Sequence, residues 1–240
     1  GTHSNAEIAP PPVLPSPPAL AHRPHMPVAL ITGGKGHLAR ALGRELRSAS
    51  YDVLAPTHEE LDVTSAQEVT TWFEALATKP DLVVHAAGAT RDRVVANMTE
   101  TDWNDVLAVN LRGAFLISRA VLRPMLKKRR GHLVFIGSYS GFNGTFGQAN
   151  YAAAKSGLTG LAKSLARETG KRGVRVNCVL PGFLESPMTS ILTAAQIEAA
   201  RSAHALGKFN TAEDAARFIV FLDSLSHVSG QVFQLDSRIR

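Results

Sequence analysis

The chain has 240 residues, of which 45% are hydrophobic, so it is long enough to form one domain with a full core. It carries 26 lysines and arginines against 20 aspartates and glutamates, which gives a net charge of +6. The single cysteine, Cys178, excludes a disulfide framework and indicates a reducing, cytoplasmic compartment. No apolar stretch approaches the roughly 20 residues that a membrane-spanning helix needs, so no membrane contact is expected.

Residues 1–26 differ in composition from the rest of the chain. They hold seven of the thirteen prolines and show no hydrophobic periodicity and no apolar signal-peptide core. This composition predicts a disordered tail of polyproline character. The folded domain is therefore expected over residues 27–240.

Strands and helices alternate along this domain. The alternation predicts an α/β fold in which a parallel sheet is covered by helices on both faces. Residues 183–208 form a variable segment, which we expect to act as a lid over a substrate. The expected strands are 28–32, 52–56, 81–86, 132–137, 174–180 and 231–235, and the expected helices are 38–48, 65–77, 101–129, 149–169 and 211–223.

The first predicted strand runs into a glycine-rich turn and then into an amphipathic helix. This order lets backbone N–H groups and a helix N-terminus approach a pyrophosphate. Glycine suits the turn because a Cβ would block the close approach. An ordinary strand-to-helix turn is the alternative, but the flanking elements favour a dinucleotide site. The residues expected to line it are Thr32, Gly33, Gly34, Lys35, Gly36, His37 and Leu38.

Tyr151 and Lys155 lie four residues apart in the predicted helix 149–169. This spacing places both side chains on one face of the helix. A phenol ordinarily titrates near ~10, and an ammonium fixed beside it is expected to lower that pKa toward the working range. Ser138, at the end of a predicted strand, is placed to donate a hydrogen bond to a substrate oxygen. Together the three residues indicate a hydride-transfer site.

With these motifs in place, the chain resembles the short-chain dehydrogenases/reductases. From about residue 27 to 235 it is most similar to the 3-oxoacyl carrier-protein reductases. The resemblance implies a single Rossmann-type domain with a doubly wound parallel sheet, and an NAD(P)-dependent enzyme that reduces a carbonyl to an alcohol. The segments that carry it are Thr32–Ala39, His85–Asp92, Asn110–Gly113, Gly137-Ser138, Asn150–Lys155 and Pro181–Thr189.

The resemblance also implies a role for each matching residue. Tyr151 would donate the proton, Lys155 would lower its pKa and bind the cofactor ribose, and Ser138 would orient the carbonyl. Asn110 would free a main-chain carbonyl of the long helix to hold a relay water. Asp62 would cap the adenine ring. The other implied cofactor contacts are Ala87, Gly88, Pro181, Gly182 and Thr189.

The chain departs from the family pattern at its glycine-rich turn. His37 and Ala39 stand where two glycines are usual, and Gly36 fits a spacing found in longer sugar-modifying relatives. His85 replaces the first asparagine of the usual Asn-Asn-Ala-Gly run. These changes leave a sugar or polyol dehydrogenase open as an alternative within the same family.

Two further departures concern the edges of the sheet. Only about five residues separate the predicted strand 52–56 from Asp62, whereas a parallel crossover needs a dozen or more. We therefore expect one flanking helix to be missing and this sheet edge to be abbreviated. Near the other edge, residues 234–238 replace a pair of glycines found in relatives.

Basic residues cluster at 127–130 and at 171–172. Solvated helix ends would explain them, because lysine and arginine are favoured in a last turn. A nucleic-acid site is not expected, since no aromatic platform or recognised module accompanies the charge. An acidic acyl carrier protein or a coenzyme A phosphate is the better partner. In the family, basic residues near these places contact the carrier, and Arg129 and Arg172 are the matching positions.

The expected function is the NAD(P)H-dependent reduction of a 3-oxoacyl thioester bound to a carrier protein or to coenzyme A. NADP(H) is the expected cofactor, because Thr57 and His58 stand where a carboxylate would bind the ribose 2′-hydroxyl of NAD(H). Glu59 and Glu60 keep NAD(H) open. An alternative of another class is a non-catalytic dinucleotide sensor. The scattered histidines give no ligand spacing, so no metal site is expected.

We also expect a homotetramer, or at least a dimer. Helix 149–169 is rich in small residues that let a second helix approach closely. Helix 101–129 carries more apolar surface, with Leu107, Phe115, Leu116 and Leu122, than one sheet face should need. The resemblance implies that these helices pair about two-fold axes.

Overall fold

The computed structural model describes residues 26–185 and 193–239 and contains one six-stranded sheet in which all neighbouring strands are parallel. The strand order is β2-β1-β3-β4-β5-β6, which is the doubly wound arrangement that the sequence predicts. The strands are β1 (Val28–Thr32), β2 (Asp52–Leu54), β3 (Leu82–His85), β4 (Gly131–Ile136), β5 (Val174–Leu180) and β6 (Val232–Gln234).

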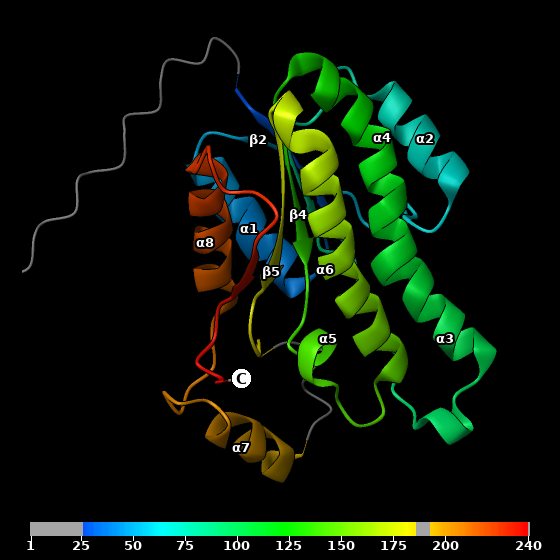
Figure 1. Cartoon of the computed structure of the whole chain (residues 1–240), viewed down its shortest axis with the longest axis vertical. Coiled ribbons are helices and arrows are strands. Elements are labelled where there is room, and N and C mark those ends of the chain that lie inside the picture. Colours follow the sequence, from blue (N-terminus) through cyan, green and yellow to red (C-terminus); the bar gives the residue numbers. More distant parts are fainter. Residues whose placement is uncertain (1–25, 186–192, 240) are drawn as a thin grey trace, which may run out of the picture.

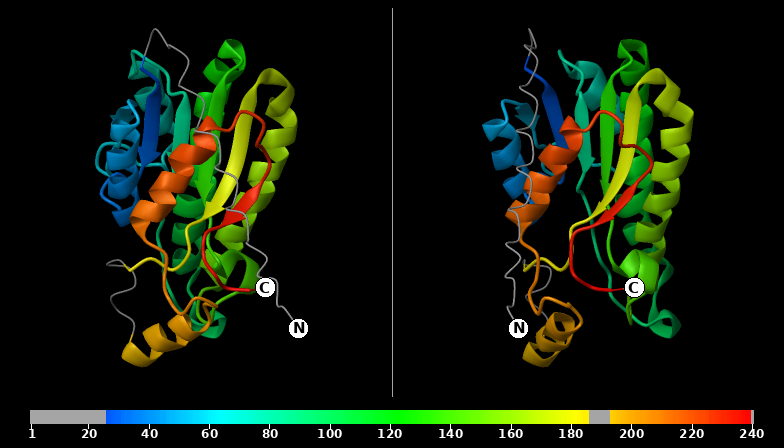
Figure 2. Two further views of the ribbon diagram at one scale, coloured as in Figure 1. Left: turned by 90° about the vertical axis from the view of Figure 1, so that its left-hand side faces the viewer. Right: turned by 60° about the vertical axis from the view of Figure 1, so that its left-hand side comes forward.

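Helices cover both faces of this sheet, as Figures 1 and 2 show. One face carries α2, α4 and α6, and the other carries α1 and α8, which pack against each other. The longer helices are α1 (His37–Ser48), α2 (Ala66–Ala75), α3 (Glu100–Leu107), α4 (Gly113–Lys128), α6 (Ala149–Thr169), α7 (Ala194–Ser202) and α8 (Ala212–Ser224). The shorter ones are η1 (Val95–Asn97), η2 (Ala108–Arg112), α5 (Ser140–Asn143) and η3 (Gly170–Arg172).

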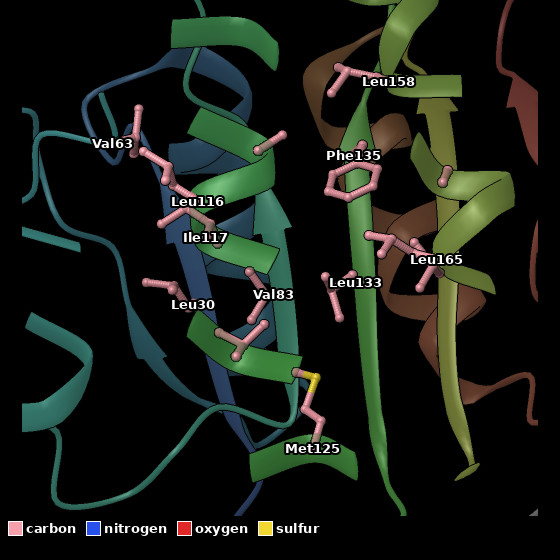
Figure 3. Packing of buried hydrophobic residues seen from close by; sticks show 14 of the residues in the cluster. Leu30, Val63, Val83, Leu116, Ile117, Met125, Leu133, Phe135, Leu158 and Leu165 are labelled. Carbon is pink, nitrogen blue, oxygen red and sulfur yellow. The ribbon is translucent and has the colours of Figure 1, made fainter. Parts of the chain in front are cut away.

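Successive strand residues enter two separate cores. In β1, Leu30 packs beneath α4, whereas Ala29 and Ile31 pack beneath α1 and α8. Figure 3 shows the first core, where Leu133 and Phe135 of β4 lie between the side chains of α4 and α6. Burial on both faces explains why the central strands read as unbroken apolar runs.

The short connection after β2 behaves as the spacing predicts. No helix lies between β2 and Asp62, where the crossover helix is expected to be missing. β2 is only three residues long and forms the edge of the sheet. Ser65 then begins α2, because its side chain accepts a hydrogen bond from the Glu68 N–H. The prediction of a missing helix and an abbreviated edge is confirmed.

The long helix predicted over 101–129 is present from Glu100 to Lys128, but it is not a regular α-helix throughout. A π-helical turn, η2, separates α3 from α4. Within it the side-chain amide of Asn110 donates to the Val106 carbonyl at 2.9 Å, a bond that the backbone N–H makes in a regular α-helix. Such π turns often occur at functional sites.

Other boundaries agree with the sequence to within two residues, and two details differ. The variable segment contains a helix, α7, which begins with a capping box between Thr193 and Gln196. Leu116, predicted to lie on an exposed helix face, is 3% exposed and belongs to the core beneath α4. Almost all of the predicted tail lies outside the described residues. Among the described helices, none is both long and apolar enough to cross a membrane.

Candidate active site

The site lies where the carboxyl ends of four neighbouring strands meet, the usual binding edge of an open parallel sheet. Thr32 ends β1, His85 ends β3, Ser138 follows β4 and Pro181 follows β5. Helix α6 begins at the same end of the sheet, beside α5, as Figure 1 shows. The topology therefore brings Tyr151 to this edge.

The structure brings the four predicted catalytic residues together. The Ser138 hydroxyl lies close enough to the Tyr151 phenol to lower its pKa. The Lys155 ammonium lies 5.4 Å from the centre of the Tyr151 ring. A Cβ placed on Gly88 would lie 3.1 Å from Asn110 Oδ1 and 3.7 Å from Lys155 Nζ, so both polar atoms face the space beside this glycine.

The predicted lowering of the Tyr151 pKa toward neutrality is not found in this structure. Burial raises the pKa of Tyr151 to about 12, and the nearby Ser138 hydroxyl offsets only part of that rise. Lys155 is itself 4% exposed, and burial lowers its pKa to about 8. Its Nζ donates to the Ile136 carbonyl at 2.8 Å. Desolvation therefore dominates the pKa of Tyr151, and the phenol is held protonated.

Asn110 is fully buried in the π turn. Its Nδ2 donates to the carbonyls of Ala89 and Val106, at 2.8 and 2.9 Å. Its Oδ1 is buried and has no hydrogen-bond partner among the described residues. A buried acceptor of this kind needs a donor. A water or a ligand hydroxyl beside Gly88 would supply one.

His85 links the glycine-rich turn to the π turn. The Ala87 N–H donates to Thr32 Oγ1 at 3.1 Å, and that hydroxyl lies 3.1 Å from His85 Nδ1. His85 Nε2 lies 3.3 Å from the Val109 carbonyl. Because a carbonyl can only accept, Nε2 carries the proton and Nδ1 accepts from Thr32. Burial, with a smaller effect of Lys155, lowers the pKa of His85 to about 3, so the ring is neutral.

His85 supplies a hydrogen-bond donor to the carbonyl that the π turn leaves without its helical partner. The Gly113 N–H donates to Ala108 in place of Val109, and the Val109 carbonyl then accepts from His85. Sequence reasoning treated His85 only as a departure from the family pattern. The signal that could have revealed its role was a titratable residue at the end of a fully buried strand.

The glycine-rich turn serves two purposes. Gly33 has a φ of 71°, which favours glycine, and a Cβ on Gly34 would lie 2.0 Å from the Ala55 carbonyl. Gly34 is therefore required by packing against the chain that follows β2. Gly36 precedes α1 and offers no side-chain cap, and the first turn of α1 has no acidic residue. This leaves the helix N-terminus available to an anion, which fits a dinucleotide.

The residues expected near the adenine half already have partners. Lys35 Nζ lies 3.0 Å from the Glu59 carboxylate, and both side chains are about two-thirds exposed. Hydrogen bonds from the backbone and from Lys35 lower the pKa of Glu59 to about 2. Asp62 Oδ1 accepts from both the N–H and the hydroxyl of Thr64, each at 2.8 Å. The adenine-capping role of Asp62 stays a prediction.

The Pro181–Gly182 turn lies at the end of β5. The Pro181 carbonyl accepts from Asn210 Nδ2 at 2.7 Å. Gly182 has a φ of 90°, which favours glycine. Thr189, expected beside the nicotinamide, lies outside the described residues.

Arg129 and Arg172 lie at the other end of the sheet. Arg129 donates to the Lys171 carbonyl at 2.9 Å, and Arg172 donates to the Leu126 carbonyl at 3.1 Å. They precede β4 and β5, whereas Ser138 follows β4. The six residues of β4 separate the two places by roughly 20 Å. The pair therefore does not line the site of its own chain.

The described residues contain no group of three or more histidine, cysteine, aspartate or glutamate side chains that could hold a metal ion. Cys178 is fully buried, and burial raises its pKa to about 11, which opposes a role as a nucleophile.

Comparison with known proteins adds to this geometry. A family model described as Enoyl-(Acyl carrier protein) reductase matches residues 36–237. The chain is 38% identical to the 3-oxoacyl-(acyl-carrier-protein) reductase FabG of Aquifex aeolicus over 86% of the chain and 85% of that relative. It is 34% identical to the Escherichia coli reductase of the same name, over 87% of the chain and 95% of the relative. The Thermotoga maritima reductase is 41% identical over 73% of the chain and 74% of the relative.

Proposed function

Because the chain belongs to the short-chain dehydrogenase/reductase family and is an NAD(P)-dependent oxidoreductase, we propose that it reduces 3-oxoacyl thioesters to their 3-hydroxyacyl forms. The observation that carries the proposal is the grouping of Ser138, Tyr151, Lys155 and Asn110 at one edge of the sheet. The names of the relatives supply the substrate class.

The residues divide the work of carbonyl reduction between them. A bound nicotinamide supplies the hydride to the carbonyl carbon. Ser138 and Tyr151 hold the carbonyl oxygen by hydrogen bonds, and the Tyr151 phenol gives its proton to that oxygen as the alcohol forms. The high pKa of Tyr151 keeps the phenol protonated until this moment. The positive charge of Lys155 then stabilises the phenolate that remains.

The proton on Tyr151 must then be replaced from solvent. Asn110 Oδ1 and Lys155 Nζ face the same space beside Gly88, and a water held there would lie next to both groups. His85 holds the π turn in place through its hydrogen bond to the Val109 carbonyl. This arrangement favours an enzyme over a dinucleotide sensor, since sensing needs no proton path.

NADP(H) is the proposed cofactor. Thr57 and His58, and not a carboxylate, stand after β2, while Lys35 lies on the turn and Arg40 on the first helix that would receive the phosphates. Glu59 is held by Lys35. A 2′-phosphate would compete with this carboxylate for the lysine, which makes the Lys35–Glu59 pair the feature that sets the preference.

A carrier protein is the proposed donor of the acyl chain, and Arg129 and Arg172 are its proposed contact. Because these arginines lie far from Ser138 of the same chain, the acyl arm would enter the site of a neighbouring subunit in the proposed homotetramer. Replacing both arginines by glutamate should raise KM for a carrier-bound substrate and leave a small thioester unaffected. An equal effect on both substrates would contradict this contact.

The cytoplasmic location that the single cysteine indicates remains a prediction.

The decisive experiment assays the purified chain with NADPH and acetoacetyl thioesters, beside a panel of sugars and polyols with NADP⁺. We expect 3-hydroxybutyryl thioester as the product and little turnover of the sugars. Turnover of sugars alone would favour the polyol dehydrogenase that the altered glycine turn leaves open. No turnover of any substrate, with dinucleotide binding intact, would favour the sensor.

A further inference from the structure

Residues 234–238 fold into a tight turn around the carboxylate of Asp236. Asp236 Oδ1 accepts from Gln234 Nε2 at 2.7 Å and from the Arg238 N–H at 3.2 Å. Asp236 Oδ2 accepts from Arg238 Nε at 2.9 Å and also from Arg238 Nη2. The two side chains are only 1% and 13% exposed. A buried ion pair is stable only when its hydrogen bonds are satisfied, and this carboxylate has four.

Arg238 extends from this turn onto the loop that carries Ser138. Its guanidinium carbon lies 3.7 Å from the centre of the Tyr139 ring, a close stacking contact. Tyr139 directly follows Ser138, and the Ser140 N–H donates to Ser138 Oγ at 3.2 Å. The position of the Tyr139 ring therefore constrains the position of the Ser138 hydroxyl.

Asp236 contacts the loop on the next strand. A Cβ on Gly182 would lie 3.0 Å from Asp236 Cβ, so the aspartate packs directly against the Pro181–Gly182 turn. The same turn is held by Asn210 through the Pro181 carbonyl. One ion pair thus touches the loop after β4 through Arg238 and the loop after β5 through Asp236.

The turn is anchored from a third side by the segment after α7. The Ala205 N–H donates to the Ser237 carbonyl at 3.0 Å, and the Leu206 N–H donates to Ser237 Oγ at 3.1 Å. His204 Nε2 lies 3.8 Å from Asp236 Oδ2. These contacts leave Arg238 little freedom to move relative to the sheet.

We propose that Asp236 and Arg238 form a positioning pair, which fixes the Ser138 loop relative to the Pro181–Gly182 turn and so sets the geometry of hydride transfer. The inference rests on the proposed function, in which Ser138 holds the carbonyl and the Pro181–Gly182 turn flanks the nicotinamide. In this proposal the pair acts through the two loops and not by contact with the substrate.

The test compares Arg238→Met, Tyr139→Leu and Tyr139→Phe with the wild type. Kcat and KM are measured for acetoacetyl thioester, the Kd for NADPH by fluorescence, and Tm by circular dichroism. We expect Arg238→Met and Tyr139→Leu each to lower kcat about tenfold or more, because small displacements at a reacting centre cost up to ~10²-fold. KM and the NADPH Kd should change less than threefold. Tyr139→Phe keeps the ring and should retain nearly full activity.

The double variant Tyr139→Leu/Arg238→Met makes the test specific. If Arg238 acts through Tyr139, the double variant should be no slower than either single variant, since removing both ends of one contact costs no more than removing one. Losses that multiply would overturn the inference. Arg217→Met is the matched control, because it breaks an exposed arginine–aspartate pair on α8 and should leave kcat unchanged.

The two proposals fail in different ways. A wild-type chain that reduces no thioester would contradict the proposed function. A wild-type chain that does so, with Arg238→Met within twofold of its kcat, would contradict the positioning role alone. If Arg238→Met does not fold, the contrast between Tyr139→Leu and Tyr139→Phe decides the same point, and equal kcat values for these two variants would overturn the inference.

Discussion

The Lys155 ammonium donates to the main-chain carbonyl of Ile136, at an Nζ–O distance of 2.8 Å, and lies 5.4 Å from the centre of the Tyr151 ring. This contact ties the charge to the end of β4, directly before the Ser138 loop. Burial holds the pKa of Lys155 at about 8, below its usual value. A lysine with this pKa carries its charge below pH 8 and loses it above.

The first prediction follows from this titration. If the charge of Lys155 is needed, kcat/KM should fall as the pH rises above about 8, while Tyr151, with a pKa of about 12, stays protonated throughout. Initial rates of thioester reduction between pH 6 and 10 would show the decline. In Lys155→Arg, residual activity should lose this decline because arginine stays charged. A wild-type profile that is flat to pH 10 would contradict the requirement.

The second prediction concerns the proton donor. Tyr151→Phe removes the phenol and keeps the ring, so NADPH should bind with nearly unchanged Kd. Loss of a positioned acid typically costs ~10²–10⁴-fold in rate, and we expect a loss of this size in kcat. Tyr139→Phe is the matched control, since it removes a phenol from a neighbouring tyrosine. A Tyr151→Phe variant with more than a tenth of wild-type turnover would show that another group gives the proton.

The third prediction concerns the Lys35–Glu59 pair, whose charged atoms lie 3.0 Å apart on the surface. The wild type should use NADPH with a higher kcat/KM than NADH. Glu59→Gln removes the carboxylate that competes for Lys35, so it should raise this preference further, and Lys35→Met should lower it. Glu213→Gln breaks another exposed ion pair, with Arg44, and should leave the preference for NADPH over NADH unchanged. A wild-type preference for NADH would overturn the cofactor assignment.

The fourth prediction concerns assembly. Phe115 of α4 is 47% exposed beside an apolar hollow that is also lined by Leu107, Leu111 and Leu161. Exposed apolar surface of this kind favours a contact between subunits. Light scattering should give a multiple of the 25.7 kDa chain mass for the wild type and a smaller particle for Phe115→Asp. Phe221→Asp, on α8, should not change the mass, although Phe221 is 54% exposed. A wild-type monomer at micromolar concentration would refute the prediction.

The fifth prediction concerns stability. Asp223 binds His132 at 2.9 Å and Arg175 at 2.8 Å, and its side chain is only 10% exposed. Asp223→Ala would leave the largely buried Arg175 without its carboxylate, which should lower the free energy of unfolding by about 3 kcal/mol. Glu198→Ala, which breaks an exposed pair with Arg201, should cost less than about 1 kcal/mol. Urea unfolding of the two variants would give the difference, and equal losses would contradict it.

The sequence alone predicted the order of strands and helices along the chain and the group Ser138, Tyr151, Lys155 and Asn110 that the structure brings together. The apolar runs of β1, β3, β4 and β5 predict strands buried on both faces. A strand covered on both sides needs apolar residues at every position, and this pattern is visible in a short stretch of sequence. The spacing of Tyr151 and Lys155 requires only that α6 be helical, and their shared face follows from its period. The connection after β2 has too few residues to contain a crossover helix, so its length alone predicts that the helix is missing.

Only the tertiary structure decided how the site is held and charged. The π turn at Asn110, the contact of His85 with Val109 and the stacking of Arg238 on Tyr139 join residues that are distant in sequence or break a local period. The pKa of Tyr151 rises and that of Lys155 falls because both are buried, and burial is a property of the packed molecule. The position of Arg129 and Arg172 at the far end of β4 likewise depends on the direction of the strands in the sheet, which local sequence spacing does not determine.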